Sequence, residues 1–475
     1  IIDVTDPSQP AHESVLEIDG SLVASRRLGD RVFLVTRYQP DSVSSAGCTS
    51  LIAPDEEPDP SQETPQMLPM LRVDGGEPVP LLDVDDCFVP ESLLSGGGSP
   101  VITTISSIDL RSPADRVSVC VAGLESTVYA SPAALYLTQP LGFSQWGFGP
   151  GQNANREQIL KFAFEDAGPT FRGEGSVQGR LAGTIDSFAL GENDGVLGVV
   201  TSTWSSEHHL SLLRERQATA DGEPRQLEEI AHLPSQAEPA PIGKPGESIR
   251  SVRFVGERVY VVTFKKIDPL YIIDISRPES PRIAGEVEVP GFSDYLHPIG
   301  SDLLLGVGKD AVDMESFAWF QGVKLELFDV SDPARLSSVA SIVAGMRGSQ
   351  SAALGDHHAV AQLSLGDGLH RLTIPVEVHE GDPASPSTHQ PWSHSGLYLF
   401  EIEENDDPSR ATIESVGAVV RAERQEDGDT YWSFPDEAST VGDRAVLHED
   451  IVHYIHDEQL WSADWFTPEE VTGPQ

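Results

Sequence analysis

A cassette of alternating apolar residues recurs along the chain and limits the folds open to it. Its clearest copy spans residues 248–278, where an alternating segment turns at Gly256 and two β-branched, aromatic-rich runs follow. The second run closes with the phrase IDISRP. Short alternating runs that end at Gly, Asp or Pro predict β-strands joined by tight turns. Each cassette is therefore expected to form three antiparallel strands.

Copies of the cassette return in the same order of elements. Those at 22–36 and 294–307 keep the turn glycine, at Gly29 and Gly300. Weaker copies lie at 126–137, 181–201, 349–363 and 433–447. A small repeated sheet has two faces to cover, so neighbouring copies must stack, and radial stacking of four-stranded antiparallel sheets is a β-propeller. Stretches after the closing proline, such as 282–289, would supply the outer fourth strand.

We therefore predict an all-β fold, with one β-propeller domain over residues 1–475 and loops inserted into its blades at 41–99 and 377–394. Six blades open near residues 22, 126, 181, 248, 293 and 349. The N-terminal runs 1–4 and 15–19 lack inner strands, whereas 433–464 lacks an evident outer strand. If these halves close the ring together, the count is seven. If missing upstream strands complete the first half, the count is eight, which we favour for the intact protein.

The net charge restricts the partners of the chain. It has 31 Lys and Arg against 75 Asp and Glu, for a net charge of −44. A surface this acidic repels nucleic acid and anionic lipid and is typical of salt-adapted or secreted proteins. No apolar run approaches the roughly 20 residues of a membrane helix, so no transmembrane segment is expected. The sequence begins within a strand-like run and carries no signal peptide, which predicts a mature or trimmed product.

Two of the three cysteines are placed for a disulfide. Cys87 precedes the third strand of its cassette, and Cys120 lies in the predicted outer strand beside it, within bridging reach. We predict a bond between them, which requires an oxidising compartment and so an extracytoplasmic location. Cys48 lies in a polar loop and is left over.

Aligning the cassettes on their turn glycines superposes three basic side chains. Arg26, Arg253 and His297 each precede the glycine by three residues, on the predicted innermost strand. They could line a central channel and bind an anion or an acidic group. Alternatively, they pair with Asp or Glu of a neighbouring blade, because buried charges need partners.

Metal ligands are considered at two places. Alternation in the run 448–457 puts His448 and Asp450 on one face, and a turn could bring His453 back toward them as a transition-metal site. Asp83 and Asp85 are hard oxygen ligands for calcium, as are the acidic residues of 403–407. Neither run matches the EF-hand loop, so plain acidic turns are the alternative. No cofactor is certain, and calcium is the cation that stays open.

A further group, Asp356, His357 and His358, is expected at the turn between the first and second strands of its blade. It matches no metal motif, and a polar loop rich in histidine is the expectation there. His370, His379, His389 and His394 are assigned to the insertion that follows.

Several phrases resemble one known family. IIDVTDPSQP, SLVASRRLGDRVFLVTRY, TVYASPAALYL, SIRSVRFVGERVYVVTFKKIDPLYIIDISRPESP, VPGFSDYLHPIGSDLLLGVG and VKLELFDVSDPA are similar to bacterial and archaeal secreted proteins with a C-terminal β-propeller distantly related to WD40 repeats. The resemblance is most specific over 251–333. It implies a propeller that is secreted, periplasmic or attached to the cell surface. Family members carry a secretory or lipoprotein signal upstream, so a lipid anchor before residue 1 is an expectation.

Two classes of function stay open. We favour a non-catalytic extracytoplasmic binding or scaffolding module that contacts envelope or extracellular proteins or surface glycans through its inserted loops. The alternative is a propeller enzyme with a pocket at the channel mouth, cation-assisted and acting on polysaccharide. No nucleophile elbow, P-loop or dinucleotide fingerprint is present in the sequence, which favours the binding module.

Overall fold

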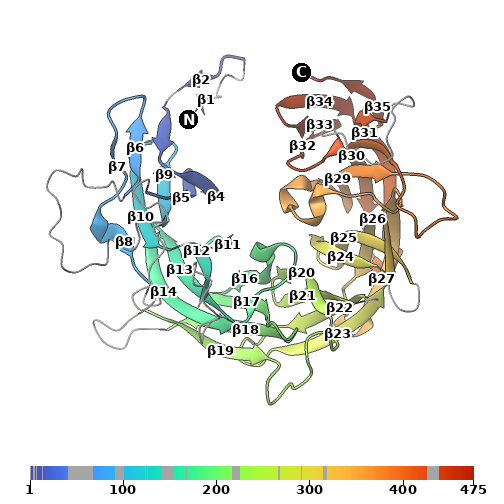
Figure 1. Cartoon of the computed structure of the whole chain (residues 1–475), viewed down its shortest axis with the longest axis horizontal. Coiled ribbons are helices and arrows are strands. Elements are labelled where there is room, and N and C mark those ends of the chain that lie inside the picture. The colour runs from blue at the N-terminus through green and yellow to red at the C-terminus, as the bar shows by residue number, and fades with distance from the viewer. Residues whose placement is uncertain are drawn as a thin grey trace. The chain divides into compact units, whose positions relative to one another are not determined.

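The computed structural model describes most of the chain as antiparallel β-sheets (Figure 1). It describes residues 2–475 except 4, 5, 7, 13, 41–67, 91–100, 124, 126, 142–154, 167, 217–224, 266, 267, 290, 314–317 and 425–437. The chain divides into two compact units. Unit 1 comprises Ile1–Gln178 and Arg214–Glu229, and unit 2 comprises Gly179–Leu213 and Ile230–Gln475. The single domain over 1–475 stays a prediction.

Unit 2 is a series of antiparallel sheets, and each sheet after the first consists of four consecutive strands. The first is β15 (Arg180–Leu181), β17 (Val196–Ser202), β18 (His208–Glu215) and β19 (Leu227–Leu233), with β16 (Leu190–Asn193) also paired to β17; β18 and β19 cross the division between the units. The second is β20 (Ser248–Val255), β21 (Arg258–Phe264), β22 (Asp268–Asp274) and β23 (Arg282–Val289). The third is β24 (Phe292–Ile299), β25 (Leu303–Asp313), β26 (Ala318–Asp329) and β27 (Ser337–Ala344).

Two more sheets complete unit 2. The fourth is β28 (Ala361–Gly366), β29 (Leu369–His379), β30 (Trp392–Glu403) and β31 (Thr412–Glu423). The fifth is β32 (Arg444–His448), β33 (Ile451–His456), β34 (Gln459–Asp464) and β35 (Thr467–Thr472). Short 3-10 turns lie in the connections: η2 (Asp186–Ala189), η3 (Pro333–Arg335), η4 (Ala352–Leu354), η5 (His357–Ala359) and η6 (Pro408–Arg410).

Successive sheets of unit 2 stack with like strands adjacent. The first strands β20 and β24 contact each other, as do β28 and β32, and the last strands β27, β31 and β35 follow the same order. Buried apolar clusters fill the spaces between consecutive sheets. One joins Leu305 and Leu325 of the third sheet to Ile374 and Phe400 of the fourth. This radial order of first and last strands is the arrangement of propeller blades.

Unit 1 contains two larger sheets and two small ones. The larger sheets are β4 (Ser21–Leu28), β5 (Arg31–Tyr38), β9 (Ile102–Asp109), β10 (Arg116–Ala122) and β8 (Cys87–Phe88), and β11 (Thr127–Ala130), β12 (Ala134–Leu141), β13 (Arg156–Glu165) and β14 (Gly168–Gln178). The small ones are β3 (Leu16–Ile18) with β6 (Met70–Val73) and β7 (Val79–Pro80), and β1 (Ile2–Asp3) with β2 (Ala11–His12).

The closing phrase of the cassette has a local physical cause. Asp274 accepts a hydrogen bond from the Ser276 amide at 3.0 Å, and Asp329 does the same for Ser331 at 3.0 Å. Such Asx turns give the backbone an alternative to the strand ladder, so the third strand ends there and the chain reverses. The turn glycines have φ values of 59°, 55° and 55°, at Gly29, Gly256 and Gly300, a region that favours glycine.

Four sequence-based expectations about strands need correction. The insertion 41–99 is not all loop, because β6, β7 and β8 lie within it. Residues 16–18 pair with β6 instead of supplying an outer strand to a blade. The segment after residue 433 gains its fourth strand from β35, so in the described part it needs no N-terminal strand. Antiparallel four-stranded sheets are thus confirmed, while the number of blades stays a prediction.

The fourth correction concerns the histidine-rich region. Asp356–His358 lie in the connection that precedes β28, ahead of the first strand and not at its turn. His370 and His379 are buried on β29, and His394 lies on β30. Both faces of β29 are covered, so apolar residues flank each of its histidines in the sequence. The prediction of a polar loop overlooked this pattern.

The predicted disulfide is confirmed. Cys87 and Cys120 are bonded, with their Cα atoms 4.3 Å apart. Cys87 does not precede the third strand directly, however, because it lies on β8, a fifth strand that pairs parallel to β10 with Cys87 opposite Cys120. Cys48 lies outside the described residues. No helix among the described residues is long and apolar enough to span a membrane.

Candidate functional site

Three first strands carry a β-bulge at the same distance from their turn glycine. The pairing register of β4, β20 and β24 with the next strand shifts at Val23, Arg250 and Asp294, six residues before the glycine in each case. A bulge leaves one residue out of the ladder and re-aims its side chain. In unit 2 the two bulged residues are a cation and an anion, and they come from neighbouring sheets.

Arg250 and Asp294 meet in a partly buried polar group that we call the bulge cluster: Thr184, Arg250, Asp294 and Lys309. Arg250 Nη1 lies 3.9 Å from Asp294 Oδ1, and the Thr184 hydroxyl donates to the same oxygen at 3.0 Å. Lys309 lies on β25 opposite Phe292, and its ammonium group donates to the carbonyl of Ser349. Asp294 and Lys309 are each 7% exposed, so both charges are largely withdrawn from water.

Burial shifts the pKa values of Asp294 and Lys309 toward neutral pH. It raises the pKa of Asp294 to about 6, although Arg250, Thr184 and Lys309 oppose the shift. It lowers the pKa of Lys309 to about 8, against the opposing effect of Asp294 and Glu377. Strongly shifted pKa values of this kind cluster at functional sites.

Arg250 is held by aromatic rings as well as by charge. Its guanidinium carbon lies 4.5 Å from the centroid of Phe292 and 5.4 Å from that of Phe264. Phe320 packs against both rings, at 4.8 and 5.5 Å between centroids. Cation–π contacts of this kind contribute on the order of 1 kcal/mol and fix the orientation of the guanidinium.

A second polar group runs from β24 to the fourth sheet of unit 2, and we call it the histidine relay: Tyr295, His297, Gln362, His370 and Glu404. His297 Nδ1 is 2.6 Å from the Tyr295 hydroxyl, and its Nε2 contacts Gln362 Oε1. Gln362 Nε2 lies 3.0 Å from His370 Nδ1, and His370 Nε2 lies 2.7 Å from Glu404 Oε1. The relay therefore links two neighbouring first strands through side chains.

Burial lowers the pKa of His297, which favours its neutral imidazole form. Burial is the main cause that lowers its pKa; Gln362 raises it, and Arg253 and His370 lower it further. A neutral imidazole donates from one nitrogen and accepts at the other, which suits a position between a hydroxyl and an amide.

Arg253 and His297 lie in the same region of unit 2. The Arg253 guanidinium stacks 4.2 Å from the ring centroid of Phe188 in η2. Phe188 in turn lies 5.8 Å from Tyr295 and 4.9 Å from His357. Their binding of an anion in a channel stays a prediction. For His297, the partner on the neighbouring sheet is the amide of Gln362, where the sequence-based alternative expects a carboxylate.

Arg26 occupies the corresponding position in unit 1. It is half-buried, and its Nη1 donates to the carbonyl of the preceding residue, Ser25, at 2.8 Å. Its role as a ligand-binding residue stays a prediction.

The structure does not gather the histidine and aspartate residues predicted to bind a transition metal. Asp450 accepts a hydrogen bond from Arg371 at 2.8 Å, and His453 Nδ1 lies 2.8 Å from the Ser462 hydroxyl. His448 is exposed at the end of β32. Within the described ranges these three do not place their ligand atoms together. Asp450 lies in the turn of the β32–β33 hairpin, between His448 and Ile451, which pair with each other.

The two predicted calcium runs serve as turns. Asp83 precedes η1 (Val84–Asp86) and donates its amide to Asp86 Oδ2 at 3.1 Å, and Asp85 is exposed in the same turn. In the run 403–407, Glu404 belongs to the histidine relay and Asp407 caps η6. Neither run forms a ligand group in the part of the chain that the structure describes.

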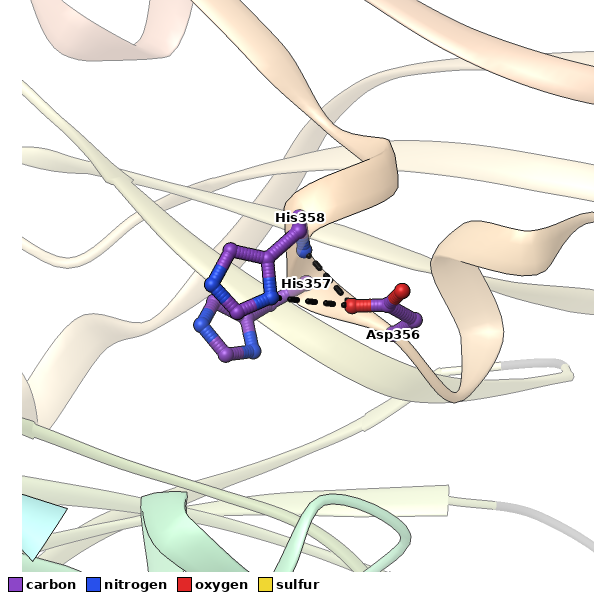
Figure 2. Close-up of side chains that lie close together, drawn as sticks. All are labelled: Asp356, His357 and His358. Atoms are coloured by element: carbon purple, nitrogen blue, oxygen red, sulfur yellow. Dashed lines mark hydrogen bonds and ion pairs between the residues drawn. The ribbon is translucent and has the colours of Figure 1, made fainter. Parts of the chain in front are cut away.

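One group of metal-ligand side chains does come together. Asp356, His357 and His358 each place one ligand atom within 4.8 Å of the others. Figure 2 shows these three side chains close together. No second such group occurs among the described residues.

Sequence reasoning missed the residues of the bulge cluster, although a signal for two of them exists. Arg250 and Asp294 each lie six residues before the turn glycine of their repeat. Arg253 and His297 each lie three residues before it. A second polar column in the aligned cassettes could have revealed them. Lys309 and Gln362 carry no such signal, because their roles depend on which sheets become neighbours.

Comparisons with known proteins support the fold. The chain is 45% identical over 87 residues to an uncharacterized protein of Methanocaldococcus jannaschii, a stretch that covers 18% of this chain and 13% of that one. It is 36% identical over 160 residues to an uncharacterized protein of Archaeoglobus fulgidus, covering 34% and 21%. The matched stretches thus span about a fifth or less of these relatives.

Solved structures give a more distant likeness. A putative 6-phosphogluconolactonase from Bacteroides fragilis aligns over 80% of this chain and 90% of its own, with a TM-score of 0.37 and 10% identity. One from Bacteroides uniformis gives a TM-score of 0.38 at 10% identity, over 78% and 90%. A family model described as a beta propeller domain matches residues 1–467, and the chain belongs to that family.

Proposed function

We propose that the chain is a non-catalytic β-propeller that binds a protein or glycan partner outside the cytoplasm. The observation that carries this proposal is the predicted insertion 377–394. Its ends belong to β29 and β30, and residues 380–391 between them form a loop with an exposed surface. Recognition residues commonly lie on loops that a rigid scaffold positions.

Gln390 is the anchor of this loop. Its side-chain amide is buried and donates to the carbonyls of Asp382, Ser385 and Thr388, at 3.5, 3.3 and 3.1 Å. Its backbone amide donates to the Arg347 carbonyl at 2.9 Å, which ties the loop to the connection before β28. A loop that is already ordered loses little conformational entropy when it binds, so less of its interaction free energy is offset by ordering.

The location outside the cytoplasm rests on the Cys87–Cys120 bond. Disulfides persist in oxidising compartments and are rare in the cytosol. The net charge of −44 agrees with a secreted or surface-attached protein, because such a surface stays soluble and repels nucleic acid.

The proposal is tested with three variants in a cross-linking and capture assay on the envelope fraction of the source cells. Replacing 382–388 by a Gly/Ser linker should abolish capture of the partner. Gln390→Ala keeps every exposed side chain but frees the loop, so it should weaken capture without abolishing it.

Asp367→Asn is the matched control, because Asp367 is exposed in the β28–β29 turn with a φ of 51°, which Asn tolerates. It should capture like the wild type. Unchanged capture by the loop replacement, with the fold intact by circular dichroism, would remove the basis of the proposal.

A propeller enzyme is the second candidate, and the bulge cluster is the observation in its favour. Asp294 and Lys309 have pKa values on either side of neutrality, as a general acid and base require. A screen for polysaccharide cleavage, with and without divalent cations, tests this candidate. Turnover that Asp294→Asn abolishes in a folded protein would replace the binding proposal with the enzyme.

A further inference from the structure

Asp356, His357 and His358, in the connection that precedes β28, form a compact set of metal-ligand atoms. Asp356 caps η5 by accepting a hydrogen bond from the His358 amide at 3.0 Å, and this turns its carboxylate back toward the two imidazoles. The rings of His357 and His358 lie 3.9 Å apart between centroids, and Figure 2 shows both beside the Asp356 carboxylate. One ligand atom from each residue lies within 4.8 Å of the other two.

Neighbouring groups hold two of the three ligands in place. Arg444 Nη2 donates to Asp356 Oδ2 at 2.7 Å, which leaves Oδ1 directed at His358 Nδ1, 3.1 Å away. The ring of Phe188 lies 4.9 Å from that of His357. Contacts of this kind orient the ligands of a metal ion and contribute to the affinity for the metal. His358 is exposed and the other two are half-buried, so an ion can reach the group from solvent.

We propose that Asp356, His357 and His358 bind a divalent transition-metal ion such as Zn²⁺. Two imidazole nitrogens and one carboxylate oxygen are a ligand set that zinc and its neighbours in the first transition row prefer. The ion takes the place of the hydrogen between His358 Nδ1 and Asp356 Oδ1. The neutral imidazole then carries its one proton on Nε2, and the Nδ1 lone pair binds the ion. Three protein ligands leave at least one position of a tetrahedral ion for water or for a group of a partner.

The rival account is that the group is an ordinary Asp–His–Arg contact. In that account Asp356 is satisfied by Arg444 and by the cap of η5, and the histidines have no common ligand. The two accounts differ in whether the histidines act together, and metal titration of matched variants measures that.

Zn²⁺ is titrated by calorimetry into the full chain after treatment with a chelator. The wild type should bind one equivalent, and His358→Gln should weaken binding by roughly tenfold or more, since even outer-shell partners contribute that much. His358 is exposed, so its replacement should leave the melting temperature of the metal-free protein unchanged. His448→Gln with His453→Gln is the control and should bind like the wild type.

X-ray absorption at the zinc edge gives an independent readout. The wild type should show scattering from two imidazoles, and His357→Gln should show one. Equal zinc affinity in His358→Gln and in the wild type, or an equal loss in the His448 and His453 control, would overturn the proposal and leave the ordinary ionic contact.

Discussion

The first strand β4 of unit 1 and the first strands β20 and β24 of unit 2 share a backbone but differ in content. All three turn at a glycine with φ between 55° and 59°, and all three carry a bulge at the same offset. In unit 1 the bulged residue is Val23. In unit 2 the bulged residues are Arg250 and Asp294, which meet across neighbouring sheets.

This difference shows that the residues that specify the strands of the repeat are not the residues that make its polar contacts. Turn glycines and alternating apolar residues are enough to specify the strands, so β4 forms as well as β20 does. The polar contacts come from two positions of the repeat, six and three residues before the turn glycine, where the strand does not require a particular residue. Neighbouring sheets are joined at these positions only where their residues are complementary. In unit 1 the described sheet of β4 has instead a covalent fastening at its outer edge, between β8 and β10.

The largest expected effect is the loss of that covalent bond. Replacing Cys87 and Cys120 together by Ala should lower the free energy of unfolding of unit 1 by about 4 kcal/mol, because the bond closes a loop across 33 residues of sequence. Hydrogen exchange should rise in β8, β9 and β10 and stay unchanged in β20–β27. An equal rise of hydrogen exchange in both units would show that the disulfide does not stabilise unit 1 selectively.

The bulge cluster should give unit 2 a pH dependence of its own. Burial raises the pKa of Asp294 to about 6, so its contribution to stability is present at low pH and is lost as pH rises through about 6, on the order of 3 kcal/mol. Lys309, with its pKa lowered to about 8, acts in the opposite sense. Its contribution is present in strong alkali and is lost as pH falls through about 8.

The cluster is therefore expected to stabilise unit 2 least between pH 6 and 8. Urea unfolding of Asp294→Asn from pH 4 to pH 7 should show a smaller fall in stability than the wild type does. Asp367→Asn, at an exposed turn, should keep the wild-type profile. Identical profiles for all three proteins would mean that Asp294 is not the group responsible.

The smallest effect compares Arg253 with Arg26. Arg253→Ala removes a guanidinium that stacks on Phe188, which should cost about 1 kcal/mol. Arg26→Ala removes a hydrogen bond to the adjacent carbonyl and should cost less than about 0.5 kcal/mol. Thermal unfolding measures both. A larger loss for Arg26 would reverse the contrast between the units.

The fold was largely predictable because its signals are local. The turn glycines, the Asp that ends each third strand and the alternation between them act within a few residues, and the Cys87–Cys120 pair follows from strands that are near in sequence. The pairing of β3 with β6 was not predictable, since it joins segments about 50 residues apart with only a few apolar residues each.

The candidate site was less predictable than the fold for a physical reason. A histidine such as His370 is placed by a strand whose two faces are covered by other sheets, so its surroundings depend on packing between sheets and not on its own segment. The same holds for Gln362, which joins His297 to His370 from a neighbouring strand. Alignment of the repeats locates positions of interest but does not identify their partners.

The parallel strand β8 has a consequence for how copies of the protein meet one another. The outermost strand of a sheet presents unpaired amide and carbonyl groups, a template on which a second chain can add a strand. In the first sheet of unit 1, β8 occupies part of that template along β10, and the bond from Cys87 to Cys120 keeps it there. A reducing environment would uncover this edge, so loss of the bond should favour strand addition between molecules as well as lower stability within one.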